Sequence, residues 1–339
     1  MHMADALISP AVGGALWTAT VATAAYAVQK VQSESNDDQV PLMGVLGAFV
    51  FAAQMINFAI PGTGSSGHLG GGLLLAILLG PAAGFLTLTT ILTVQALFFA
   101  DGGLLALGCN IFNLGFYTCF VAYPLIYRPL VKEQQSHSRS VAGALLAAVV
   151  GLQLGSLSVV GETFLSGVTA LPFKTFLFLM QPIHLAIGIV EGLVTAAVVV
   201  FIWKARPEIL ERHKTVSTTR TLRPVLIGLL AVALLTGGVV AWFASSQPDG
   251  LEWSLFRSAG QVEVGKETPI HRTLAAFQEK LALLPDYNFK KAGGMTEDTA
   301  GNIAAAGTST AGLAGACLTL GLAAFVGLGL KMAVRRSRK

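Results

Sequence analysis

Long apolar stretches separated by short polar segments run through most of this chain. A membrane-spanning helix needs about 20 mostly apolar residues, and several stretches come close to that length. They cover residues 11–28, 41–60, 104–126, 141–160, 175–203, 224–244 and 310–332. Only 12% of the residues are charged and 53% are hydrophobic, whereas a soluble domain carries about 25% charged residues. The pattern predicts an all-α polytopic membrane protein.

The apolar stretch at 69–100 is too long for one span and is interrupted at Gly80-Pro81. As a single helix it would measure about 48 Å, against a hydrocarbon core of about 30 Å. Proline inside a helix kinks or breaks it. We therefore expect a hairpin, with an under-length arm at 69–79 that spans or re-enters the membrane, and a longer arm at 82–100. This gives about nine transmembrane segments, with two of them after residue 223.

Basic residues are concentrated in the loop at 128–139, in the linker at 204–223 and in the tail from residue 331. Short loops rich in Lys and Arg face the cytoplasm. Counting back through nine segments places the N-terminus and the loop at 61–67 outside and the C-terminus in the cytoplasm. If 69–100 crossed only once, the N-terminus would instead face the cytoplasm.

The first ten residues, 1–10, contain a candidate nitrogen chelator. The Met1 amine, the backbone nitrogen of His2 and the His2 imidazole can bind one ion once the amide is deprotonated. A second imidazole would complete a square plane, which suits nickel(II) and copper(II) and accommodates cobalt(II) with adjusted geometry. The best second histidine is His68, after a Gly/Ser-rich loop whose glycines let the backbone approach an ion closely. The alternative is a frayed terminus without function.

These ten residues, with Gln54-Met55-Ile56-Asn57-Phe58 and Gly67-His68-Leu69-Gly70-Gly71, resemble the CbiM/NikM family. Its members are the substrate-binding (S) components of energy-coupling-factor transporters for cobalt and nickel. The resemblance implies that the Met1 amine, the His2 amide nitrogen, the His2 ring and the His68 ring bind the transported ion. It also implies a transmembrane coupling (T) subunit and ATPase subunits as partners, and a multi-pass location in a prokaryotic cell (inner) membrane. No cofactor is expected besides the transported nickel(II) or cobalt(II).

Four polar residues flank the candidate ligands and can hold an imidazole in orientation, as hydrogen-bonding groups beside metal ligands do. They are Asp5, Asn57, Ser65 and Ser66. Asp5 can equally cap the first helix.

Polar residues inside predicted spans are costly and often functional. His184 and Glu191 lie seven residues apart and share a helix face, as do Asn110 and Asn113. We interpret the His184–Glu191 pair either as an internal hydrogen-bonded pair that joins helices, or as a second metal or proton site. The second interpretation corresponds to a proton-coupled secondary metal transporter, but the sequence shows no matched inverted repeats.

The chain divides into a metal-binding core at 1–205, a cytoplasmic linker at 206–223 and an accessory module at 224–339. In the module, two spans enclose an external segment at about 245–309. Near its start, Pro248-Asp249-Gly250-Leu251-Glu252 resembles the PDGLE module that accompanies CbiM/NikM proteins as a small accessory subunit. Asp249 and Glu252 either collect cations for the site or form a solvated turn. Residues 271–284 predict an amphipathic helix with His271 on its polar face.

No enzymatic activity is expected. Gly260, Gly265 and Lys266 fit the spacing of a P-loop, but Glu267 replaces the Ser/Thr that would hold magnesium. ATP hydrolysis should therefore occur on partner subunits. The absence of an H-E-x-x-H motif argues against an intramembrane metalloprotease, and no basic run interleaved with aromatics suggests nucleic-acid binding. The predicted function is the substrate-specific component of an ATP-driven nickel/cobalt importer, with the all-nitrogen plane slightly favouring nickel.

Overall fold

The computed structural model describes residues 2–34, 39–131, 136–205, 223–259, 268–289 and 297–337, and within the last range it describes only the backbone of 297–303 and 334–337. Several parts of the sequence-based predictions lie outside these ranges. They are Met1, nearly all of the linker at 206–223, and the P-loop-like residues within 260–267.

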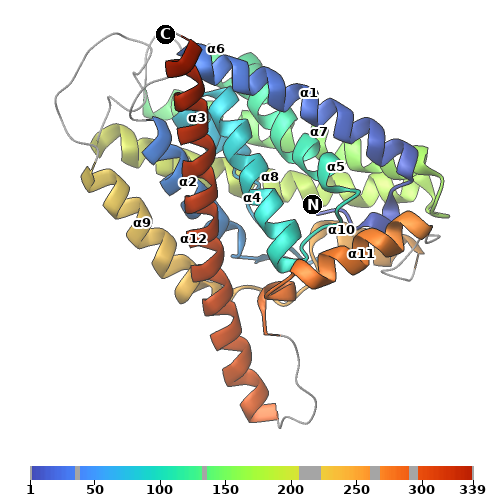
Figure 1. Ribbon diagram of the computed structural model, residues 1–339. Coiled ribbons are helices and arrows are strands. Elements are labelled where there is room, and N and C mark those ends of the chain that lie inside the picture. Colours follow the sequence, from blue (N-terminus) through green and yellow to red (C-terminus); the bar gives the residue numbers. More distant parts are fainter. Residues whose placement is uncertain are drawn as a thin grey trace.

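Helices make up most of the described residues up to 205, together with one short β-hairpin (Figure 1). The elements are η1 (Asp5–Leu7), α1 (Pro10–Glu34), α2 (Gln39–Gln54), β1 (Phe58–Ile60), β2 (Ser65–Gly67), α3 (Gly72–Leu79), α4 (Pro81–Phe99), α5 (Leu107–Ile111), η2 (Phe112–Tyr127), α6 (Arg128–Val131), α7 (His137–Ser166) and α8 (Phe173–Ala205). The remaining elements are α9 (Arg223–Gly238), η4 (Val240–Phe243), α10 (Gly250–Ala259), α11 (Pro269–Leu281), η5 (Pro285–Tyr287) and α12 (Glu297–Ser337).

Six helical stretches among the described residues are long and apolar enough to cross a membrane. They are Pro10–Glu34, Pro81–Phe99, Leu107–Val131, His137–Ser166, Phe173–Ala205 and Ala304–Ala333. The apolar helices α2 and α9 are shorter, at 16 residues each. The prediction of a helical, polytopic membrane protein is confirmed.

The predicted hairpin at 69–100 is present as α3 and α4. Gly80 joins them with φ +84°, a left-handed conformation that glycine adopts without steric cost, and Pro81 starts α4. The two backbones touch at Gly84, where an added Cβ would lie 2.8 Å from the Ala76 nitrogen. With eight residues, α3 is about 12 Å long and cannot cross a bilayer core by itself; every one of its residues is buried.

The predicted helix at 41–60 ends earlier than expected, at Gln54. The next residues turn into β1, which pairs antiparallel with β2 so that Phe58 faces Gly67 and Ile60 faces Ser65. Gly62 and Gly64, both with positive φ, reverse the chain between the strands. Apolarity alone could not reveal this change, because strand and helix residues are equally hydrophobic here.

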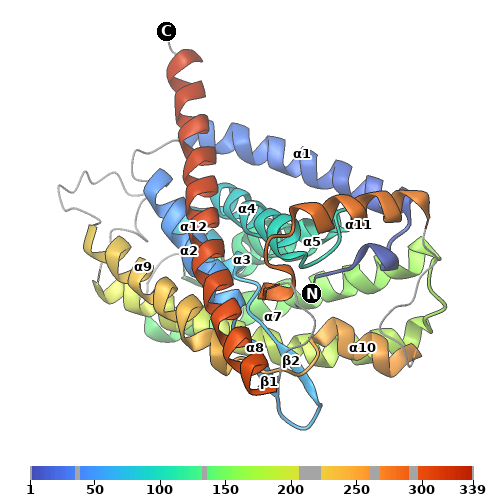
Figure 2. The same cartoon turned by 60° about the horizontal axis from the view of Figure 1, so that its bottom comes forward.

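The accessory helices pack directly on the core. Helix α12 runs along α2, α9 and α4, and small residues on α2 permit close approach: a Cβ on Gly47 would lie 3.1 Å from Thr319 Cγ2. At the end of the bundle away from the C-terminus, α10 and α11 lie on either side of the N-terminal segment (Figures 1 and 2). The N-terminus is therefore enclosed by both parts of the chain.

Candidate metal-binding site

The N-terminal segment after Met1 is packed and hydrogen-bonded, rather than frayed. Met3 is fully buried. Its backbone N–H donates to Asn110 Oδ1 at 2.8 Å, and its carbonyl accepts from Asn110 Nδ2 at 3.2 Å and from the Gly103 backbone N–H at 2.9 Å. These bonds fix the residue that follows His2. The sequence indicated Asn110 only as a polar residue within a span. In the structure its side chain holds the backbone next to the candidate chelator in place.

Two further side chains hold this segment. Asp5 Oδ1 accepts from the Ala106 backbone N–H at 2.9 Å, so its carboxylate joins the segment to the loop after α4 instead of capping α1. His271 of α11 lies 2.9 Å from the Ile8 carbonyl through Nε2 and bonds the N-terminal turn of its own helix through Nδ1. The helix was predicted correctly, but His271 is 4% exposed and does not lie on a solvated face.

The imidazoles of His2 and His68 meet, as the sequence analysis required. Their ring centroids are 5.1 Å apart and their planes differ by 12°, so the rings are stacked. Burial lowers the pKa of each histidine to about 3. Both rings are therefore neutral at physiological pH, which is the form that binds metals. Met1, the remaining predicted ligand, lies outside the described residues.

The other polar residues predicted near the site bond mainly to backbone. Ser65 Oγ donates to the Ser66 carbonyl at 3.1 Å, and Ser66 Oγ donates to the Gln247 carbonyl at 2.8 Å. The Asn57 carbonyl accepts from the Ser245 N–H at 2.7 Å. Asn57 and Ser66 thus join the β-hairpin and the residues before it to the accessory module, whereas the Ser65 hydroxyl bonds within the hairpin.

Glu191 holds the segment that follows His68. Its two carboxylate oxygens accept from the Gly70 N–H at 2.7 Å and from the Gly71 N–H at 3.0 Å. His184 Nδ1 lies 2.8 Å from the Met180 carbonyl, one helical turn earlier. The two side chains therefore bond different partners and not each other. His184 faces a void of about 10 Å³ that His68 also lines.

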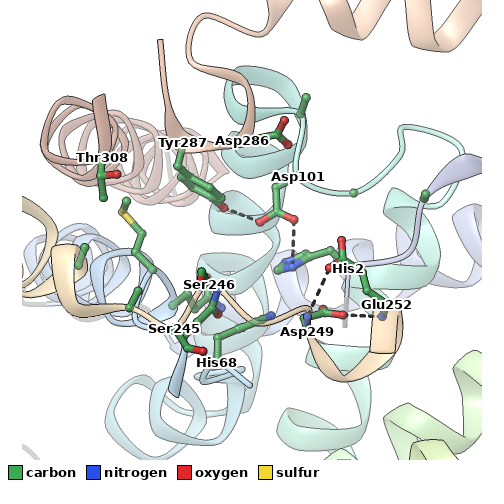
Figure 3. A pocket seen from close by; sticks show the side chains of 18 of the residues that line it. His2, His68, Asp101, Ser245, Ser246, Asp249, Glu252, Asp286, Tyr287 and Thr308 are labelled. Carbon is green, nitrogen blue, oxygen red and sulfur yellow. Dashed lines mark hydrogen bonds and ion pairs between the residues drawn. The ribbon is translucent and has the colours of Figure 1, made fainter. Parts of the chain in front are cut away.

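The accessory module reaches the site through the segment predicted from its PDGLE motif. The Pro248 carbonyl accepts from the Ser66 N–H at 2.8 Å, and Ser66 and Asp249 form a parallel β-bridge. Asp249 Oδ1 accepts from the Glu252 backbone N–H at 2.8 Å, which caps α10. Because Asp249 and Glu252 line the same pocket as the two histidines (Figure 3), the motif is part of the site's wall.

Two residues of the site were missed by the sequence analysis. Asp101, just after α4, places Oδ1 3.3 Å from His2 Nδ1, and the Tyr287 hydroxyl of η5 donates to Asp101 Oδ2. Burial raises the pKa of the Asp101 carboxyl. An acidic residue directly after an apolar span was a usable signal for Asp101, whereas Tyr287 stands 186 residues away in a segment without a motif.

These residues line an open pocket of about 1000 Å³ at the end of the bundle. We call it the capture pocket; His2, His68, Asp101, Asp249 and Tyr287 are among its lining residues (Figure 3). Among the described side chains, no group of three or more His, Cys, Asp or Glu lies at metal-binding spacing.

The helical bundle and this histidine-bearing pocket define a polytopic membrane protein with features of a metal transport component. The CbiM family, described as the cobalt uptake substrate-specific transmembrane region, matches residues 2–209, and the PDGLE domain matches residues 223–332. The chain belongs to the CbiM family, with a PDGLE domain fused at its C-terminal side. It is accordingly a transporter component and not an enzyme.

Individual relatives agree with this assignment. The fused nickel transport protein NikMN of Rhodobacter capsulatus is 30% identical over 263 residues, covering 71% of this chain and 74% of the relative. A protein of Archaeoglobus fulgidus that shares the NikMN name is 31% identical over 322 residues, covering 95% of this chain and 96% of the relative. A crystal structure described as a transition metal transporter matches with a TM-score of 0.55 and 33% identity, covering 63% of this chain and 98% of that one.

Proposed function

We propose that this chain is the substrate-specific component of an ATP-driven nickel/cobalt importer of the energy-coupling-factor type. The observation that carries the proposal is the stacking of His2 on His68 in the capture pocket. The Met1 amine and the His2 backbone nitrogen supply the other two donors of a square plane, which suits nickel(II) and accommodates cobalt(II). Ion binding displaces protons from the amine and the amide.

We further propose the topology and partners of this importer component. About nine segments, with α3 and the non-helical residues 68–71 before it counted together as one crossing, put the capture pocket outside and the C-terminus in the cytoplasm. In support, α6 and the C-terminus lie at one end of the bundle while α10 and α11 lie at the other (Figure 1). A transmembrane coupling subunit and ATPase subunits would drive transport in the prokaryotic cell (inner) membrane, with residues 1–205 as the metal-binding core and 224–339 as the accessory module.

The proposal is tested by measuring nickel and cobalt binding to the purified full chain with its native N-terminus. Two changes should abolish tight, stoichiometric binding: an added Gly-Ser before Met1, which moves the amine, and His68→Ala, which removes a ring donor. His137→Ala is the matched control, because His137 begins α7 and its ring packs beside Trp203, outside the pocket. If the extended chain and His68→Ala both bind one ion as tightly as the native chain, the site lies elsewhere and the proposal is wrong.

A further inference from the structure

A chain of three side chains connects the accessory module to His2, with Asp101 in the middle. Asp101 Oδ1 lies 3.3 Å from His2 Nδ1, and Asp101 Oδ2 accepts the hydroxyl proton of Tyr287. Asp101 comes from the core, directly after α4, whereas Tyr287 ends η5 of the accessory module (Figure 3). No sequence motif and no family assignment points to these two residues.

The contact involves the ring nitrogen that the proposed ion needs. Nδ1 is the nitrogen nearer the side chain's attachment point, so it can close a six-membered chelate with the His2 backbone nitrogen. Nε2, on the far side of the ring, cannot reach an ion held by that backbone nitrogen. In this structure Nε2 is buried and has no hydrogen-bond partner among the described residues. Asp101 thus lies against the nitrogen that must bind the ion, and it orients the ring.

The backbone on both sides of the Asp101–Tyr287 contact is strained. Within the described ranges, the non-glycine residues with positive φ are Ala100 (55°), Asp286 (52°) and Tyr287 (57°). Such conformations persist only where surrounding contacts enforce them, and they cluster at ligand sites and switch regions. Here all three residues belong to or directly precede the Tyr287–Asp101 hydrogen bond: Ala100 precedes Asp101, and Asp286 precedes Tyr287. The Tyr287 ring also stacks on Phe99, with centroids 5.0 Å apart and planes 14° apart.

The carboxylate is positioned to act on a cation. Its side chain is 24% exposed and lines the capture pocket, so it meets an arriving ion without leaving its place. A fixed carboxylate beside the His2 ring attracts a divalent cation strongly, because the partly buried surroundings screen the attraction between the two charges less than water does. The Tyr287 hydrogen bond keeps the carboxylate from turning toward solvent.

We propose that Asp101, held by Tyr287, is a positioning residue of the capture site, and that the accessory module acts on ion binding through this contact. The inference rests on the proposed function. Before ion binding the carboxylate restrains the His2 ring at Nδ1. The arriving ion takes Nδ1, and the carboxylate remains beside it as a balancing negative charge. The fused module is therefore needed for full affinity even though it supplies none of the four nitrogen donors.

The test measures equilibrium binding of nickel(II) alone to the full chain with a native N-terminus. Tyr287→Phe removes one hydroxyl and keeps the ring on Phe99. We expect it to weaken binding about 10- to 100-fold, the range typical for residues that orient metal ligands. Asp101→Asn should weaken binding at least as much. The double variant should bind no more weakly than Asp101→Asn alone, because Tyr287 acts through Asp101. The visible absorption of bound nickel should keep its position, since the four nitrogen donors remain.

Tyr117→Phe is the matched control, because its hydroxyl bonds Ser158 at 3.4 Å, outside the capture pocket; it should bind nickel like the wild type. Wild-type affinity in Tyr287→Phe, or additive losses in the double variant, would overturn the inference while leaving the proposed function intact. If instead His68→Ala binds as tightly as the wild type, the proposed function fails and the inference fails with it.

Discussion

Asn110→Ala is the substitution that most directly tests whether the buried N-terminal segment builds the metal site. The Asn110 side chain is 1% exposed and makes two hydrogen bonds to the Met3 backbone, of 2.8 and 3.2 Å. The Met3 carbonyl keeps the bond from the Gly103 N–H, but the Met3 N–H loses the partner described here. The change therefore loosens the segment that carries His2 while leaving the surrounding helices in place.

The size of the effect follows from the two lost bonds. A buried hydrogen bond contributes about 0.5–1.5 kcal/mol net, so docking of the N-terminal segment should weaken by about 1–3 kcal/mol. Only the docked segment brings its nitrogens to His68, so this free energy is also lost from ion binding. At 1.4 kcal/mol per factor of ten, nickel affinity should fall by about fivefold to 150-fold. Titration calorimetry against a competing chelator measures this range.

The matched control is Asn113→Ala, one turn further along the same helical stretch. Asn113 is also buried, but its amide donates to Glu162 Oε2 at 2.9 Å and makes only a 4.0 Å contact to the Met3 sulfur. It should lower thermal stability with little change in nickel affinity. Wild-type affinity in Asn110→Ala, or equal losses of affinity in both variants, would refute the reasoning.

Three further predictions concern pH and the chain around His68. Nickel affinity should fall about 100-fold per pH unit below the α-amine pKa of about 7.7–8.0, because the amine and the amide each lose a proton on binding. Both site imidazoles have pKa values lowered to about 3, so they release no further protons on ion binding in this pH range. A plot of nickel affinity against pH that steepens near pH 6.5 would contradict the neutral state of the two rings. Glu191 accepts from the Gly70 and Gly71 N–H groups with different oxygens, so Glu191→Gln keeps one acceptor and turns an NH2 donor toward the other N–H. The loss of one hydrogen bond should lower stability by about 1–2 kcal/mol in thermal unfolding and weaken nickel binding; an unchanged melting temperature would count against this. Gly71→Ala places a Cβ 2.3 Å from Val50 Cγ1 at φ +75°, so the melting temperature should drop. Gly161→Ala, inside α7 with nothing within 4 Å of the new Cβ, should not lower it, because alanine favours a helix more than glycine does.

The apolar helices and their main interruption were predictable because each depends on local sequence. The proline at position 81 cannot continue a helix, so the break between α3 and α4 could be placed within a few residues. The helix α11 was also predicted from its apolar spacing. The end of α2 at Gln54 was not, because the following residues are as apolar as those within the helix.

The candidate ligands His2 and His68 could be proposed from residue type and position, since an amine followed by histidine has a fixed chelating geometry. Their supporting residues could not. Asn110 is separated from Met3 by 107 residues, and Tyr287 from Asp101 by 186. Contacts of that kind leave no local pattern, because they depend on how whole helices pack.

The sequence by itself determined the polytopic helical class, the hairpin at 69–100 and the histidines of the capture pocket, because hydropathy, proline geometry and ligand chemistry act over short distances. Only the tertiary structure decided that the segment after Met1 is anchored to the core through Met3, that Glu191 holds the chain after His68, and that the accessory module forms part of the pocket wall. The physical reason is that these contacts join segments brought together by helix packing, and their hydrogen bonds form only once that packing excludes water.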